Sequence, residues 1–294
     1  MAGLLDAELL GRFRTLDLVA RGLVEGFITG LHRSPYHGFS VEFSQHRPYM
    51  PGDDTRHIDW KLYGRTGRYH IKQFEEETNL RASVLLDCSA SMGYGSGSMT
   101  KFRYGTLLAS CLMYLMIRQR DAAGLVLFDE KMRQKLPPRS VRSYLNTLLS
   151  AMENQQPSEG TRIADTLHIM AESLRRRGLV VLISDLFDDE EQVIHGLRHF
   201  RHGGHEVIVF QILDPAELDF GRLGAGRYQD METRELLSTD PRQVRDAVNR
   251  EVRAFVSRIK DACHADGIDH VLVDTSRDFD SVLLEYLIKR RRLA

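Results

Sequence analysis

From residue 81 onward, short apolar runs alternate with segments whose apolar residues recur every three to four positions. The runs have the length of strands, are rich in Val, Ile and Leu and contain few polar residues, which is typical of strands buried on both faces of a sheet. The segments between them have the spacing of amphipathic helices. We therefore expect a parallel sheet with helices on both faces, joined by right-handed crossovers. The predicted strands are residues 82–86, 124–128, 179–184, 207–213 and 270–274.

The helical spacing is clearest between residues 104 and 116, looser between 163 and 174, and present again between 252 and 259. Residues 132–136 predict one further short strand, which two prolines end and which suits the edge of the sheet. The alternation favours a Rossmann-like α/β fold for most of the chain.

The chain before residue 80 has a different pattern. Residues 1–31 predict a helix, although three glycines weaken the prediction. Residues 39–44 and 68–74 alternate like exposed strands. The irregular segment 214–241 contains a candidate hairpin around residues 232–234, and we expect it to pair with these strands in a small β lobe. The predicted parts are residues 1–79, an N-terminal helix with the β lobe, and residues 80–294, the main domain with an insertion at about 214–241.

Composition excludes several classes of partner. The 294 residues include 40 Lys and Arg against 41 Asp and Glu, a formal charge of −1, so no global field draws the protein to nucleic acid or to an anionic membrane. The longest uncharged apolar stretch, residues 106–117, is shorter than the ~20 residues that span a bilayer. Charges interrupt the N-terminus, which therefore does not resemble a secretion signal. We expect a cytoplasmic protein with no membrane span.

The cysteines agree with this compartment. Cys88, Cys111 and Cys263 lie far apart in sequence and form no CxxC pair. They provide neither a disulfide framework nor a zinc site. We expect all three to be small buried residues.

The pentapeptide Asp-Cys-Ser-Ala-Ser at positions 87–91 carries the oxygen donors of a divalent-cation site. It follows the first apolar run directly, so Asp87, Ser89 and Ser91 leave the end of a buried strand. Open parallel sheets bind ligands beyond the carboxyl ends of strands, where the strand order reverses. Carboxylate and hydroxyl oxygens suit Mg2+, which keeps water or a partner's oxygen in its remaining positions. The alternative is a capped loop, because Asp and Ser are also common in turns.

Two later residues strengthen the prediction of a cation site. Asp185 follows the strand at 179–184, and Thr161 precedes the helix that begins near residue 163. Each has an ordinary alternative role as the cap of a helix. Together they offer oxygens that complete a six-coordinate shell with water and one open position. Two carboxylates held close would also repel each other without a cation.

With these residues, the chain from about residue 80 to 290 resembles the von Willebrand factor type A domain and its metal-ion-dependent adhesion site. Asp87, Ser89 and Ser91 match the first loop of that motif, Thr161 matches the second and Asp185 the third. In that family, a partner's Asp or Glu commonly fills the open metal position. The resemblance implies protein binding that requires Mg2+ or another divalent cation, rather than chemistry.

A second resemblance covers nearly the whole chain. Residues 49–61, Tyr-Met-Pro-Gly-Asp-Asp-Thr-Arg-His-Ile-Asp-Trp-Lys, resemble the signature of the bacterial family called domain of unknown function 58, as do residues 74–77 and 214–217. The family has a von Willebrand-like part after this signature block. Its association with MoxR-type AAA+ ATPases implies a partner of that kind in protein assembly or maturation.

The signature block itself has mixed charge, which argues against a one-sided basic surface for nucleic acid. We expect Arg56, Asp59 and Trp60 to hold the block against the first strand and its loop. Direct contact with a partner is the alternative role.

The predicted function is a non-enzymatic, metal-dependent protein-binding module. One alternative is a scaffold whose metal site is vestigial. Another is a metal-dependent phosphohydrolase, but phosphatases that place Asp at the end of a first strand use a second Asp two positions on, where this chain has Ser89. The sequence also lacks a G-x-S-x-G nucleophile turn and a Walker lysine loop.

Overall fold

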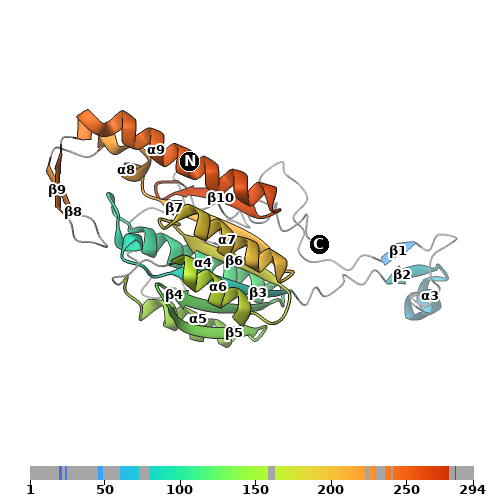
Figure 1. The fold of residues 1–294 in the computed structure, drawn as a ribbon. Helices are drawn as coiled ribbons and strands as arrows, with labels where there is room; N and C mark the ends of the chain where they lie inside the picture. The colour runs from blue at the N-terminus through green and yellow to red at the C-terminus, as the bar shows by residue number, and fades with distance from the viewer. Residues whose placement is uncertain are drawn as a thin grey trace. The chain divides into compact units, whose positions relative to one another are not determined.

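The computed structural model describes residues 20–21, 24, 46–48, 60–72, 80–157, 163–222, 226–229, 236–239, 241–277 and 282. By its internal contacts the chain divides into two units, one made of Met1–Phe27 with Leu80–Ala294 and the other of Ile28–Asn79. The described part of the larger unit is built on one central sheet with helices on both faces (Figure 1).

The central sheet has six strands in the order β10-β7-β6-β3-β4-β5. Neighbouring strands are parallel except β4 and β5, which are antiparallel. Every strand predicted from the apolar runs is present, and so is the edge strand, which confirms the Rossmann-like α/β fold class. The strands are β3 (Arg81–Asp87), β4 (Ala122–Phe128), β5 (Met132–Arg139), β6 (Leu179–Ser184), β7 (Glu206–Leu213) and β10 (Asp269–Asp274).

Helices cover both faces of this sheet (Figure 1). Residues of α6, α7 and α9 form one continuous core with the sheet, whereas α4 packs on the opposite face with α5 beside it. Because successive side chains of a strand point to opposite faces, Leu85 enters the first core while Leu86 meets α4. The helices are α4 (Lys101–Arg118), α5 (Tyr144–Glu153), α6 (Ile163–Ser173), α7 (Glu190–His202) and α9 (Pro241–Ala265).

A glycine brings α4 unusually close to the sheet. A Cβ at Gly105 would lie 3.1 Å from Ile183, 3.2 Å from Leu86 and 3.3 Å from Ile212. Only a residue without a side chain fits there without displacing its neighbours. This close packing fixes the first turn of α4 beside the carboxyl ends of β3 and β6.

The edge strand extends further than the sequence predicts. β5 includes Pro137 and Pro138 and ends at Arg139, so the prediction that the prolines end this strand is wrong. The register between β4 and β5 shifts around Gly124, whose Cβ would lie 2.7 Å from backbone atoms of Leu136 and Pro138. Prolines are tolerated at a sheet edge beside such an irregularity, because their missing N–H groups leave no ladder partner unpaired.

The strand order reverses between β3 and β6. From β3 the chain passes to β4 on one side and later returns to β6 on the other, so two strands distant in sequence become neighbours. Loops leaving the carboxyl ends of such a pair diverge and form the crevice where open α/β sheets bind ligands. Asp87 ends β3 and Asp185 follows β6, which places both carboxylates at this position.

Two short antiparallel ladders lie outside the main sheet. β1 (His46–Pro48) pairs with β2 (His70–Lys72), and β8 (Gly226–Gln229) pairs with β9 (Leu236–Thr239). The expected β lobe, which would join the insertion to strands before residue 80, stays a prediction. The predicted strand at 39–44 lies outside the described residues.

Part of the N-terminal signature block is described. Trp60 begins α3 (Trp60–Thr66), is 62% exposed and contacts Tyr63 edge to face, and Tyr63 stacks on Tyr69. Arg56 and Asp59 lie outside the described residues, so their role in holding the block stays a prediction.

The remaining predictions concern the N-terminus, the cysteines and the membrane. Ala20, Arg21 and Val24 are helical, and both Ala20 and Val24 are fully buried; the rest of the predicted N-terminal helix lies outside the described residues. All three cysteines are buried, as predicted. Among the helices that the structure describes, none has both the length and the apolar character needed to cross a bilayer.

Candidate metal centre

Asp87 is the last residue of β3, and its side chain is completely buried. The hydroxyl of Ser184, at the end of β6, donates to Asp87 Oδ2 over 2.6 Å, and the backbone N–H of Ser89 donates to Asp87 Oδ1 over 2.8 Å. The Ser184 hydroxyl also accepts from the backbone N–H of Leu186, which fixes its direction. Within the described residues, Asp87 therefore has neutral hydrogen-bond donors and no ion-pair partner.

The environment of Asp87 disfavours its charge. The pKa of the Asp87 carboxyl is raised from 3.8 to about 7: burial is the largest cause, the negative charge of Asp185 adds to it, and the hydrogen bonds from Ser184 and Ser89 offset part of the increase. The effect of Asp185 shows that the two carboxylates are close enough to interact. A positive ion at Asp87 would reverse this penalty.

Ser89 and Ser91 supply the hydroxyls of the first loop. Their Oγ atoms lie 3.1 Å apart, and both side chains are buried. The loop is held from the β4–β5 side, because Arg133 donates to the carbonyl of Cys88 over 3.2 Å and pairs with Asp129 over 2.7 Å. The two hydroxyls therefore have fixed positions beyond the end of β3.

The third loop begins at Asp185, which is completely buried. Asp185 Oδ1 accepts from the backbone N–H of Phe187. The backbone carbonyl of Asp185 accepts from the side-chain amide of Gln211. Leu186 between them has a φ of +63°, a left-handed conformation that is unusual for a leucine. Such backbone strain persists only where the surrounding contacts determine it, and here it turns the loop sharply after β6.

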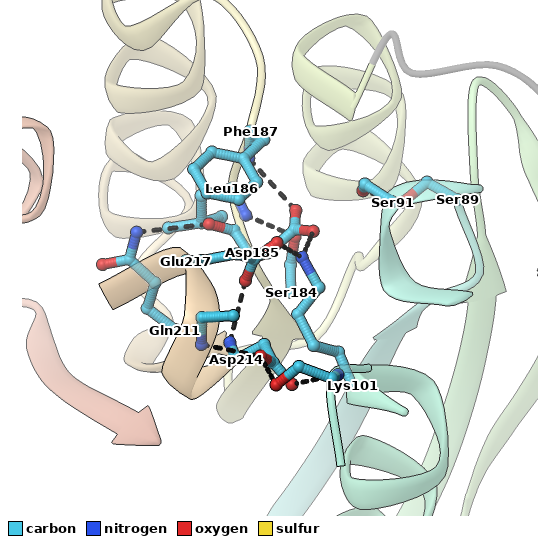
Figure 2. Close-up of polar contacts among 12 residues, drawn as sticks. Ser89, Ser91, Lys101, Ser184, Asp185, Leu186, Phe187, Gln211, Asp214 and Glu217 are labelled. Carbon is cyan, nitrogen blue, oxygen red and sulfur yellow. Dashed lines mark hydrogen bonds and ion pairs between the residues drawn. The ribbon is translucent and has the colours of Figure 1, made fainter. Parts of the chain in front are cut away.

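Unlike Asp87, Asp185 has a cation beside it. Lys101 Nζ lies 2.7 Å from Asp185 Oδ2 and 2.6 Å from Glu217 Oε1, and the lysine side chain is completely buried. Burial acts to lower the pKa of Lys101, but the two carboxylates outweigh this effect and the pKa is raised overall. Burial also raises the pKa of Glu217, which the Lys101 ammonium offsets in part. Figure 2 shows this cluster to one side of Ser89 and Ser91.

The segment Asp214-Pro-Ala-Glu217 connects this cluster to the first loop. It begins α8 (Pro215–Leu218) as a capping box, in which the Asp214 carboxylate accepts from Ala216 N–H and the Glu217 carboxylate accepts from Asp214 N–H. Asp214 also accepts from both the backbone N–H and the hydroxyl of Ser96. The segment thus holds the loop after β3 and orients the carboxylate that meets Lys101.

The donor set around Asp87 fits a hard divalent cation. One buried carboxylate and two adjacent hydroxyls are the oxygen ligands that Mg2+ accepts, with water completing the shell. Across the described residues, no three His, Cys, Asp or Glu side chains converge as a metal site, so any such ion would depend on hydroxyl and water oxygens.

The fifth predicted ligand, Thr161, lies outside the described residues. The helix expected after it is present, since α6 begins at Ile163. The carboxylate of Asp188, from the third loop, accepts from the backbone N–H of Ala164 in the first turn of α6. The second and third loops are therefore tied together, although the role of Thr161 stays a prediction.

Sequence reasoning missed three residues of this centre: Lys101, Ser184 and Glu217. Lys101 stands in the apolar stripe of its helix, three residues before Tyr104, which is a position where a charge needs a partner. Glu217 is visible as the last residue of an Asp-Pro-Ala-Glu capping box. Ser184 has no signal of its own, because its role follows from the pairing of β6 with β3.

The comparisons with known proteins identify a family. The chain matches the model of the family described as protein of unknown function DUF58 over residues 45–257. It is 27% identical over 295 residues to an uncharacterized protein of Mycobacterium tuberculosis, with 98% of this chain and 91% of that protein covered.

Two solved structures are also similar. The conserved hypothetical protein BatB from Bacteroides thetaiotaomicron is 17% identical, with a TM-score of 0.47, over 72% of this chain and 98% of that chain. The SpRpn10 VWA domain is 17% identical, with a TM-score of 0.44, over 70% of this chain and 95% of that chain.

Proposed function

The chain belongs to the family described as protein of unknown function DUF58, and from that premise we propose that it is a non-enzymatic protein-binding module that requires a divalent cation. Asp87, Ser89 and Ser91 hold Mg2+ in this proposal, Thr161 contributes from the second loop, and Asp185 lies on the third-loop side, where its carboxylate pairs with Lys101. When bound, the cation supplies an open position that an Asp or Glu of a partner protein fills.

The observation that supports this proposal most directly is the state of Asp87. Its carboxylate is fully buried and, within the described residues, is compensated only by hydrogen bonds. Burying a charge without a counter-ion is costly, and proteins keep such an arrangement where it has a use. A cation at Asp87 removes the cost and at the same time creates a site for an anionic group.

The wider setting of the proposal comes from the family. We propose that the protein acts in the cytoplasm as an adaptor of a MoxR-type AAA+ ATPase in protein assembly or maturation. The support for this partner is family membership, and the support for the compartment is that all three cysteines are buried apolar residues. Neither nucleic acid nor a membrane surface is part of the proposal.

The test is capture of a purified MoxR-type ATPase from the same organism by the immobilised protein, in Mg2+ and in EDTA. We expect capture by the wild type in Mg2+ only, and no capture by Asp87→Ala in either condition. Asp246→Ala is the matched control, because Asp246 is an exposed aspartate on α9, far along the chain from the proposed ligands.

Two results would contradict the proposal in different ways. Capture that survives EDTA and the Asp87→Ala substitution would indicate a scaffold whose metal site is vestigial. Mg2+-dependent turnover of phosphoesters that is lost in Asp87→Ala would indicate a phosphohydrolase instead. Circular dichroism of each variant separates a lost ligand from a lost fold.

A further inference from the structure

Lys101 is a completely buried lysine in a protein whose proposed function depends on a cation. Lysine is almost never fully buried unless it is paired, and here it contacts two carboxylates. Two aromatic rings complete its surroundings, since its Nζ lies 5.0 Å from the ring centroid of Phe187 and 5.9 Å from that of Tyr94. The ammonium thus occupies a built cation site on the third-loop side of the crevice.

The partners of Lys101 are held in place independently of it. Asp185 is oriented by the N–H of Phe187, and Glu217 by the capping box of α8. The backbone of Lys101 is fixed as well, because α4 begins at this residue and Thr100 caps the helix. Since every group is positioned by other contacts, little entropy is lost in forming the pair, which distinguishes it from a surface salt bridge.

The two carboxylates of the crevice therefore differ in what compensates them. The charge of Asp185 is balanced by an ammonium of the chain itself, whereas the charge of Asp87 is balanced, within the described residues, by neutral donors alone. Figure 2 shows the Lys101 side chain reaching Asp185, with Ser89 and Ser91 to one side.

We propose that Lys101 is the resident counter-ion of Asp185 and keeps this carboxylate out of the metal shell, so that Asp87 is the one charged protein ligand of the divalent cation. This inference rests on the proposed function and specifies the site that the partner meets. The ion and Asp87 together carry a net charge of +1, and Lys101 offsets one of the two negative charges on the third-loop side, those of Asp185 and Glu217. Lys101 thereby preserves the attraction of the open position for a partner carboxylate.

A metal titration distinguishes the proposed role of Lys101 from a merely structural one, because the two roles predict opposite changes in metal affinity when the lysine is removed. If the lysine were merely structural, removing it would weaken binding of the ion. In the proposed arrangement, removing it leaves Asp185 without its cation, and a divalent ion gains a second carboxylate. Lys101→Met keeps the length and volume of the side chain while deleting its charge.

The experiment is titration of the metal-free protein with Mn2+, as a spectroscopic substitute for Mg2+, followed by electron paramagnetic resonance. We expect Asp185→Asn to bind Mn2+ within about threefold of the wild type, and Lys101→Met to bind it about tenfold more tightly or better. Asp87→Asn should lose binding. The double variant Lys101→Met/Asp185→Asn should bind Mn2+ more weakly than Lys101→Met, because the carboxylate that the ion gains in the single variant is then absent.

Urea denaturation of the same proteins in EDTA measures the pair without any metal. We expect the midpoint to fall in Lys101→Met and to recover partly in the double variant, because the charge of Asp185 is then absent and only that of Glu217 is left without Lys101. Should Lys101→Met fail to fold in EDTA, Asp185→Asn, which leaves Lys101 paired with Glu217, still decides the question through its Mn2+ affinity.

The possible failures are distinguishable. A loss of Mn2+ binding in Asp185→Asn equal to that in Asp87→Asn would overturn the role given to Lys101 while leaving the proposed function intact. Mn2+ affinities in the expected order, without capture of a partner in Mg2+, would overturn the proposed function and support the inference. A wild type that binds no Mn2+ at millimolar concentration would overturn both.

Discussion

The buried carboxylate of Asp87 makes the stability of the metal-free protein depend on pH in a direction opposite to that of most aspartates. Its pKa is raised from 3.8 to about 7, mainly by burial. Between these two values the folded protein binds one more proton than the unfolded protein at this position. The free energy of unfolding therefore falls as pH rises from about 4 to about 7, and this contribution is constant above that range.

The size of the effect follows from the shift. A displacement of about 3 pKa units corresponds to roughly 4 kcal/mol in total, at about 1.4 kcal/mol per unit. Part of it has already been lost at pH 5, so linkage predicts a further loss of roughly 2–3 kcal/mol between pH 5 and pH 8.5. Asp87→Asn has nearly the same shape but no charge, and removes this pH-dependent loss.

The assay is urea denaturation of the wild type, Asp87→Asn and the exposed control Asp246→Asn, in EDTA at both pH values. We expect Asp87→Asn to gain roughly 2–3 kcal/mol over the wild type on going from pH 5 to pH 8.5, and Asp246→Asn to follow the wild type. Addition of Mg2+ at pH 8.5 should stabilise the wild type and leave Asp87→Asn unchanged. A constant difference between wild type and Asp87→Asn at the two pH values would refute the argument that Asp87 has no counter-ion among the described residues.

Three further substitutions test the contacts around the centre. Ser184→Ala removes the hydroxyl that joins Asp87 to the N–H of Leu186 and should lower the free energy of unfolding by about 1–3 kcal/mol in urea denaturation. The loss should be larger at pH 8.5 than at pH 5, because the hydrogen bond is stronger to the charged carboxylate. Equal losses at the two pH values would contradict this. Gly124→Ala places a Cβ 2.7 Å from backbone atoms of β5 and should lower stability by about 1–3 kcal/mol, so an unchanged melting temperature would show that the edge strand yields freely. Asp214→Ala removes both the cap of α8 and the contact that holds the loop after β3. It should lower the free energy of unfolding by about 1–2 kcal/mol and speed proteolysis in that loop. A loop as resistant to proteolysis as in the wild type would mean that other contacts hold it.

The sequence predicts the main sheet well because its strands are buried on both faces. Runs such as residues 179–184 contain nothing but apolar residues and a terminal serine, and all six residues of β6 are buried. The crevice follows from the same pattern, since polar residues directly after two of these runs must lie at the carboxyl edge of a parallel sheet. This pattern predicts both Asp87 and Asp185 as residues of the crevice.

What the sequence does not contain is the order of the strands and the partners that it brings together. The bond from Ser184 to Asp87 exists because β6 lies beside β3, and residues about a hundred positions apart give no local sign of that pairing. The prediction also assumed that two close carboxylates need a metal ion. Lys101 shows that a chain can supply part of the positive charge itself.

The most direct test of the proposed metal centre is the anomalous diffraction of a crystal grown with Mn2+. We expect one strong peak at about 2.1 Å from oxygen atoms of Asp87, Ser89 and Ser91, with Asp185 still paired with Lys101. The absence of a peak at Asp87, or a peak bound directly to Asp185 with Lys101 displaced, would contradict the assignment of these residues.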